Sequence, residues 1–167
     1  MARDAISRQY DVDKSSVKLV IEKATGDYWP GTISFHAKNG KSINLDLIRE
    51  SIQATRLSGG TQMRVTYLEV TATGQITAGQ LEAGFRVTGT GQEFILAQDP
   101  TAAPKGGQTA FQRLQAALGR GEKVTSITGR VEGWNGRFPD VLRALEAESK
   151  SPGKRPRLMV TDFATAP

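Results

Sequence analysis

The chain lacks cysteine, has a single histidine and contains no long apolar run. Without cysteine it can form no disulfide, offers no thiolate ligand to a metal ion and has no thiol nucleophile. The histidine, His36, would need several carboxylates or carbonyls around it to complete a metal site, and none stands at local spacing. The longest apolar runs, such as residues 94–97, are far shorter than the roughly 20 residues that cross a membrane. We therefore expect no metal site, no cofactor and no membrane insertion.

The amino-terminal residues 1–15 show neither a targeting signal nor a folding pattern. They mix both charge signs and have no apolar stretch, so they do not resemble a signal peptide. The chain as written is therefore expected to be cytoplasmic, or periplasmic if a signal peptide has been removed from it. The same residues are polar and aperiodic, which predicts a mobile arm. A single domain is expected over residues 16–167, and the breaker-rich residues 99–108 are where it would subdivide.

The chain is basic, and its positive excess lies towards the carboxy terminus. Its 167 residues carry a formal net charge of +5. Between residues 120 and 157 there are nine Lys or Arg against five Asp or Glu, whereas the rest of the chain is nearly neutral. A basic region attracts polyanions such as nucleic acid through a salt-sensitive field. The alternative is a solvated, mildly basic surface that binds no polyanion.

Seven segments are predicted to be strands from period-2 alternation or from β-branched and aromatic residues. They are residues 16–23, 32–36, 63–74, 85–89, 93–97, 123–134 and 158–163. In the first segment Val17, Leu19 and Ile21 alternate with other residues, which predicts one face against the core. Thr90-Gly91 is expected to join the fourth and fifth segments as a hairpin. Gly129 interrupts the sixth, which indicates a bulge or the close approach of another backbone.

Three segments have the apolar spacing of amphipathic helices. The clearest covers residues 109–119, where Thr109 and Gln112 fit a capping box and Gly119 suits the left-handed residue that ends a helix. Its buried stripe is expected to contain Phe111, Leu114 and Leu118. The other two helices are expected to begin near residues 42–44 and at Pro139. The order β-β-α-β-β-β-α-β-α-β predicts an α+β fold with a mainly antiparallel or mixed sheet.

No constellation of residues in the sequence specifies a reaction. Gly40-Lys41-Ser42 follows a strand and opens a helix, as a phosphate-binding loop does, but Phe35 stands where that loop needs its first glycine. There is no nucleophile-elbow pattern, and the carboxylates are scattered along the chain. An enzyme would therefore have to assemble its acids and bases through the fold.

Aromatic residues beside basic ones form the one candidate ligand site. Trp134, Arg137 and Phe138 lie between a predicted strand and a predicted helix, with Arg130 on the strand before them. A tryptophan can stack a base while an arginine meets a phosphate, which is how single strands are bound with little sequence preference. The alternative is that Trp134 and Phe138 pack the third helix onto the sheet. The loop before the last strand adds further positive charge: Lys154, Arg155 and Arg157.

Residues 31–134 run strand, helix, strand, strand, helix, strand if residues 85–89 and 93–97 count as one bent element. This order resembles the ferredoxin-like βαββαβ sandwich of heavy-metal-associated domains and of small periplasmic mercury or copper carriers. The resemblance implies a ferredoxin-like core plus flanking elements. It does not extend to soft-metal binding, because the CxxC pair of that family would fall where this chain has Asn39, Gly40 and Lys41. A competing interpretation is an OB-like or other small barrel with inserted helices, which suits nucleic-acid binding.

The sequence favours a non-enzymatic binding or accessory module, with an unidentified protein as its partner and no bound metal. The first alternative is a basic single-stranded nucleic-acid-binding protein that uses Arg130, Trp134, Arg137 and the basic loop at residues 154–157. The second alternative is a small enzyme with carboxylate chemistry. Each of these functions depends on which side chains the fold brings together.

Overall fold

A computed structural model shows the chain as two compact units, Met1–Val65 and Thr66–Pro167. The boundary between the units falls just ahead of a strand that begins at residue 69. The structure describes residues 2–9, 11–23, 31–45, 48, 51–52, 54, 65, 67–77, 82–132 and 155–167.

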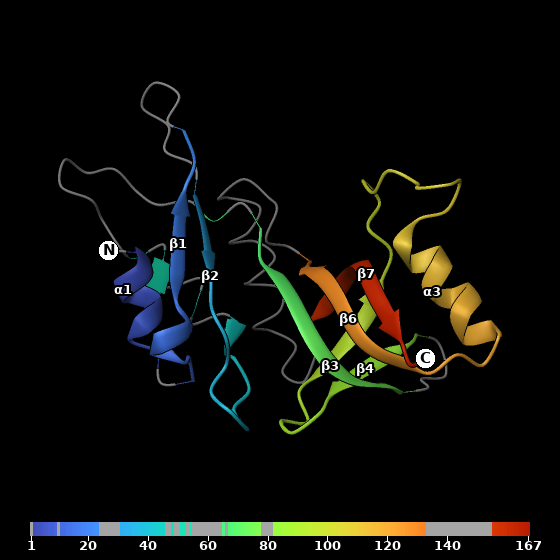
Figure 1. The fold of residues 1–167 in the computed structure, drawn as a ribbon, viewed down its shortest axis with the longest axis horizontal. Helices are drawn as coiled ribbons and strands as arrows, with labels where there is room; N and C mark the ends of the chain where they lie inside the picture. The colour runs from blue at the N-terminus through green and yellow to red at the C-terminus, as the bar shows by residue number, and fades with distance from the viewer. Residues whose placement is uncertain are drawn as a thin grey trace. The chain divides into compact units, whose positions relative to one another are not determined.

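The first unit contains a short helix, a 3₁₀ turn and a two-stranded sheet among its described residues (Figure 1). Their bounds are α1 Ala2–Ser7, η1 Lys14–Ser16, β1 Lys18–Ile21 and β2 Gly31–Ser34. Helix α1 lies in the stretch for which the sequence predicts a mobile arm, and its Ile6 is only 1% exposed. Val12 is also fully buried. Residues 1–15 therefore contribute buried apolar side chains.

Strand β1 pairs antiparallel with β2, and Leu19 stands opposite Ile33. The exposed fractions of its apolar side chains are 43% for Leu19, 62% for Val20 and 60% for Ile21. The predicted strand is confirmed. Of the face expected to pack against the core, Val17 is buried, but Leu19 and Ile21 are exposed. Period-2 alternation follows from the pleat of a strand and does not determine what covers each face.

Two of the three predicted helices fall mainly outside the described residues. The helix expected to begin near Ser42 or Asn44 is described only in part. In it the Ile48 N–H donates to the Asn44 carbonyl at 3.2 Å, which is the bonding pattern of an α-helical turn, and Ile48 is buried. The helix expected to begin at Pro139 lies wholly outside the described part of the chain.

The second unit is a closed barrel of five strands with a helix beside it (Figure 1). The strands are β3 Glu69–Thr77, β4 Gly84–Val87, β5 Glu93–Ala97, β6 Val124–Val131 and β7 Arg157–Thr165. The helix, α3 Ala110–Gly119, stands between β5 and β6 in the chain and lies against β7. The last five of the seven predicted strands are therefore the five strands of one barrel.

The barrel closes in the order β3-β4-β5-β7-β6, with β6 pairing back to β3. Neighbouring strands are antiparallel except β5 and β7, which run parallel with Leu96 opposite Leu158. Strand β3 is long enough to pair with β6 through residues 69–73 and with β4 through residues 74–77. This five-stranded Greek-key order, with a helix between the third and fourth barrel strands, is the topology of an OB-type barrel.

The predicted fold class, an α+β protein with three helices and a ferredoxin-like βαββαβ core, is wrong. The described residues form a mostly β structure in which α3 is the one helix longer than six residues. The ferredoxin-like order required residues 85–89 and 93–97 to form one bent element. They form the two strands of a hairpin instead, because Phe85 and Phe94 stand opposite each other and are both fully buried. The hairpin at Thr90-Gly91 is confirmed.

The buried apolar side chains of this unit come from four strands and from α3. A Cβ added at Gly74 of β3 would lie 2.8 Å from the Phe85 ring and closer still to the Arg86 carbonyl. A Cβ added at Gly129 of β6 would lie 2.7 Å from the Leu158 side chain, at the point where the β6–β7 register shifts. The predicted irregularity at Gly129 is thus confirmed, and both glycines let two strands approach over a packed side chain. The largest fully buried side chains of this unit are Phe85, Phe94, Leu114, Ile127, Leu158 and Val160.

Helix α3 begins as the sequence predicts. The Gln112 N–H donates to Thr109 Oγ1 at 3.2 Å and the Thr109 N–H donates to Gln112 Oε1 at 2.9 Å, which completes the capping box. Its end differs from the prediction. The Gly121 N–H bonds back to the Leu118 carbonyl, and Gly121, with a φ of 76°, takes the left-handed conformation expected of Gly119.

Candidate nucleic-acid interface

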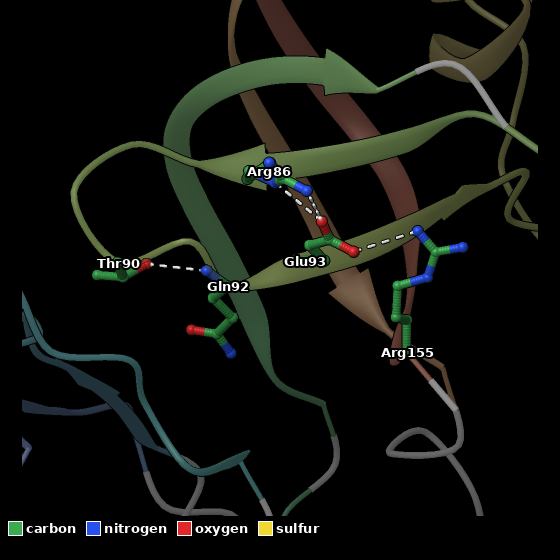
Figure 2. Close-up of polar contacts among 5 residues, drawn as sticks. All are labelled: Arg86, Thr90, Gln92, Glu93 and Arg155. Atoms are coloured by element: carbon green, nitrogen blue, oxygen red, sulfur yellow. Dashed lines mark hydrogen bonds and ion pairs between the residues drawn. The ribbon is translucent and has the colours of Figure 1, made fainter. Parts of the chain in front are cut away.

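Three charged side chains form a row across the outer face of β4 and β5 (Figure 2). Arg86 of β4 stands opposite Glu93 of β5, and its Nη2 and Nε atoms donate to Glu93 Oε1 at 2.6 and 2.8 Å. Arg155, which precedes β7, donates from Nη1 to the other carboxylate oxygen of Glu93 at 3.3 Å. The alternation that buries Phe85 and Phe94 turns Arg86 and Glu93 outward.

The turn between these strands is fixed by its own contacts. The Gln92 N–H donates to Thr90 Oγ1 at 3.2 Å (Figure 2). Gly91 takes a φ of 70°, a conformation that side chains disfavour. Because the turn geometry sets the pairing register of a hairpin, these contacts help to place the two opposite charges face to face.

In this row two arginines share one carboxylate. The row as a whole therefore carries one net positive charge. The hydrogen bond from Arg86, and then the weaker one from Arg155, hold the pKa of the Glu93 carboxyl below its usual value, while desolvation opposes them. The Arg86 and Arg155 side chains are 61% and 48% exposed, so both can be reached from solvent. Exposed ion pairs contribute little to stability, and an incoming phosphate can therefore exchange with the carboxylate.

We expect the Glu93 ion pairs to make stability depend on pH in the acid range. Because its folded pKa lies below the ordinary value of 4.5, the stabilisation is fully present above that value and is lost as pH falls through the folded pKa. Glu93→Gln should therefore be less stable than wild type at neutral pH, and the difference should disappear in acid. Urea denaturation at a series of pH values measures this difference.

NMR titration of the Glu93 carboxyl carbon tests the cause of that shift. Arg86→Ala should raise the Glu93 pKa more than Arg155→Ala does, because the Arg86 hydrogen bond is the largest cause of the lowering. A Glu93 pKa at or above 4.5 in the wild-type protein would contradict the ion-pair geometry.

Arg157, the first residue of β7, is held by two glutamates. Its Nη1 lies 2.7 Å from Glu82 Oε1, and its Nε lies 3.1 Å from Glu132 Oε2. Glu82 precedes β4 and Glu132 follows β6, so the guanidinium joins the ends of three barrel strands. Both of its carboxylate partners are more exposed than Arg157 itself, which is 34% exposed.

Arg130 faces outward near the end of β6. Its guanidinium carbon lies 4.4 Å from the centroid of the Tyr67 ring, and its Nε lies 3.7 Å from Glu69 Oε2. Glu69 stands opposite Arg130 in the β3–β6 pair and also accepts from Thr161 Oγ1 at 3.5 Å. The Tyr67 ring is 42% exposed. A guanidinium over a tyrosine presents flat surfaces of the kind on which a nucleic-acid base can stack.

Three of the seven predicted site residues are described by the structure. Arg130, Arg155 and Arg157 lie at the ends of β6 and β7 that the connection at residues 133–154 joins, and each is paired with a different glutamate. The other four lie outside the described residues, although the chain places them all in that connection. They are Trp134, Arg137, Phe138 and Lys154.

Sequence reasoning missed Arg86 and Tyr67 and left Glu93 among the scattered carboxylates. A signal for the Arg86–Glu93 pair exists, since opposite charges on either side of a hairpin turn are candidates for a cross-strand pair. Tyr67 had no such signal. Its contact with Arg130 depends on the pairing of β3 with β6, which are distant in the chain.

No three of the His, Cys, Asp and Glu side chains of the described residues gather in a way that could hold a metal ion. A surface depression of about 300 Å³ beside the end of α3 contains one acidic and one basic residue, Glu122 and Lys123, and no assembled acid–base pair. None of the helices in the described part of the chain has the length and apolar composition needed to span a membrane.

No protein-family model, curated protein or solved structure matches the chain. Function is therefore inferred from the barrel topology and from the side chains on its surface.

Proposed function

We propose that the protein binds single-stranded nucleic acid through the outer face of β4 and β5 and the connection between β6 and β7. One observation carries the proposal, namely that the barrel order makes residues 133–154 the connection between the fourth and fifth strands. In OB-type barrels, this connection and the face of the second and third strands bind oligonucleotides. Trp134, Arg137 and Phe138, which the sequence alone singles out, belong to this connection.

The charged row on β4 and β5 supports the same function. Arg86 and Arg155 share the Glu93 carboxylate, so a phosphate that approaches either arginine meets net positive charge and displaces only an exposed ion pair. Arginine suits this role, because its planar guanidinium donates two hydrogen bonds to a phosphate at once. The overall charge of +5 draws a polyanion towards the protein before these contacts form.

Aromatic residues supply the second part of the proposed interaction. Trp134 and Phe138 provide flat apolar surfaces on which successive bases can stack, while Arg137 between them meets the backbone. Tyr67 under the Arg130 guanidinium adds a described stacking surface at the end of β6 from which the connection departs. Because every base has an aromatic face, stacking of this kind binds single strands with little preference for sequence.

Fluorescence anisotropy with a labelled oligothymidine tests the proposal. We expect micromolar or tighter binding at low salt, because several phosphates contact arginine. The logarithm of the binding constant should fall with the logarithm of salt concentration with a slope of about −2, the value for three phosphate contacts on a single strand. A duplex of the same length is the control and should bind more weakly, since its bases cannot stack on the protein. A flat titration at low salt would rule the proposal out.

A protein partner is the second candidate, favoured by the apolar surface of β1. Leu19, Val20 and Ile21 are all substantially exposed on a strand that has one neighbour among the described residues. Exposed apolar strand surfaces are common sites of protein association. The same titration separates the candidates, because an accessory module that recognises only protein would leave the oligonucleotide unbound at every salt concentration.

A further inference from the structure

A second group of basic side chains surrounds a surface depression between α3, β6 and β7. The depression has a volume of about 240 Å³ and opens beside the start of α3. Its three cations come from three elements: Lys105 from the loop after β5, Arg113 from the first turn of α3, and Arg130 from β6. Thr161 of β7 forms part of the wall. Helix α3 lies against β7 (Figure 1). Residues that are distant in the chain therefore meet at one place.

Two of these cations, Lys105 and Arg113, differ from the arginines beside β4 and β5, each of which is bonded to a glutamate. The Lys105 and Arg113 side chains form no hydrogen bond or ion pair within the part of the chain that the structure describes. Arg130 Nε lies 3.7 Å from Glu69, beyond hydrogen-bond distance, and is a buried donor without a hydrogen-bond partner among the described residues. The donors of Lys105 and Arg113 are therefore available to an acceptor in the depression.

The one carboxylate among the described lining residues does not neutralise this group. Asp99 is 8% exposed, and its Oδ1 accepts from the Thr101 N–H at 2.8 Å and from the Thr101 hydroxyl at 2.7 Å. With Asp99 and the Glu69 carboxylate that pairs with Arg130 both counted, the three cations around the depression leave an excess of one positive charge. An excess of positive charge around a depression concentrates the potential on an approaching anion.

The start of α3 adds to the positive potential of the depression. Ala110, the first residue of the helix, lines the depression together with Arg113. The amino terminus of a helix carries a partial positive charge that favours a nearby anion. The helix end acts here as a supplement to the three side-chain cations, and the capping box holds it in a fixed position.

We infer that this depression is a phosphate-binding site formed by Lys105, Arg113 and Arg130. Two guanidinium groups and one ammonium group supply donors that match the several acceptor oxygens of a phosphate. The depression is smaller than the roughly 300–1,000 Å³ of pockets that enclose whole small-molecule ligands, so it fits a single phosphate group. That group is either a free phosphate or a backbone phosphate of nucleic acid, and only the second form rests on the proposed function.

Titration of the ¹⁵N-labelled full chain with sodium phosphate, compared with sodium chloride at matched ionic strength, tests the site by NMR. We expect phosphate, and not chloride, to shift the backbone amide signals of residues 99–113 and the Nε–H signal of Arg113. Lys105→Ala and Arg113→Ala should each weaken phosphate binding about tenfold, because each removes one charge-assisted hydrogen bond.

Lys123→Ala and Arg120→Ala are the matched controls, since neither residue lines this depression and Arg120 is paired with Glu122. Both should bind phosphate as the wild type does. Equal shifts in phosphate and chloride, or equal weakening by a control, would overturn the inference. If Lys105→Ala also weakens oligonucleotide binding, the site holds a backbone phosphate, and if it weakens phosphate binding alone, the site holds a free phosphate. Phosphate binding by a protein that ignores oligonucleotides would end the proposed function and keep this site.

Discussion

Phe85→Ala is expected to lower the free energy of unfolding of the barrel by about 3–5 kcal/mol. Phe85 is fully buried, stands opposite Phe94 in the β4–β5 hairpin and lies under Gly74 of β3. Its removal leaves a cavity that cannot collapse, because the β3 and β4 backbones already approach closely at Gly74. Native-state hydrogen exchange of the β4 and β5 amides measures the loss in this unit alone.

Two further variants make this prediction specific to the barrel interior. Phe85→Leu keeps most of the apolar volume and should cost clearly less than Phe85→Ala. Tyr67→Ala removes an aromatic ring that is 42% exposed and should cost only about 1 kcal/mol, mainly its contact with Arg130. If Phe85→Ala cost no more than Tyr67→Ala, Phe85 would not be part of a closed interior.

Replacement of Trp134 and Phe138 by alanine is expected to reduce oligonucleotide binding by about tenfold or more for each residue. Each substitution removes one surface on which a base can stack, and stacking contributes about 1–3 kcal/mol per base. The salt dependence should keep its slope, because no phosphate contact is lost. Fluorescence anisotropy at two salt concentrations measures both quantities.

Trp29→Ala is the matched control for these variants. Trp29 is the other tryptophan of the chain and belongs to the unit Met1–Val65, outside the barrel. Its replacement should leave oligonucleotide binding unchanged. An equal loss on replacing Trp29 would mean that stacking is not confined to the connection between β6 and β7.

The local elements of the barrel unit could be predicted from the sequence because their signals are local. The capping box needs only Thr109 and Gln112, and the β4–β5 hairpin needs only its alternation and the Thr90-Gly91 turn. The close approach at Gly129 follows from a glycine inside a strand pattern. Each of these features is determined by residues within a few positions of one another.

The closure of the barrel could not be predicted in the same way. It depends on the parallel pairing of β5 with β7, which are separated by α3, β6 and residues 133–154. The sequence shows that both segments are strands but does not show that Leu96 stands opposite Leu158. The apolar periodicity of the two predicted helices that lie mainly outside the described residues also favoured an α+β class. The architecture depends instead on which strands pair.

Some residues of the candidate sites could likewise be predicted from local sequence, and others only from the fold. Trp134, Arg137 and Phe138 are close in the sequence, so their composition alone marks them as a candidate ligand site. Lys105 and Arg113 form no pattern in the sequence. They line a common depression with Arg130 only because α3 packs against β7. Arg157, a predicted phosphate contact, is paired with two glutamates, and no local sequence pattern predicts these pairs.

Photo-crosslinking locates the bound strand and tests the central claim most directly. A 4-thiothymidine oligonucleotide is irradiated with the full chain, and the adducts are mapped by mass spectrometry after trypsin digestion. The barrel topology predicts adducts in the peptides 131–137 and 138–143, which contain Trp134 and Phe138, and in the peptide 87–105, which contains β5. Adducts confined to residues 1–65, or an absence of adducts under conditions where the oligonucleotide is bound, would contradict the claim that the barrel binds the strand.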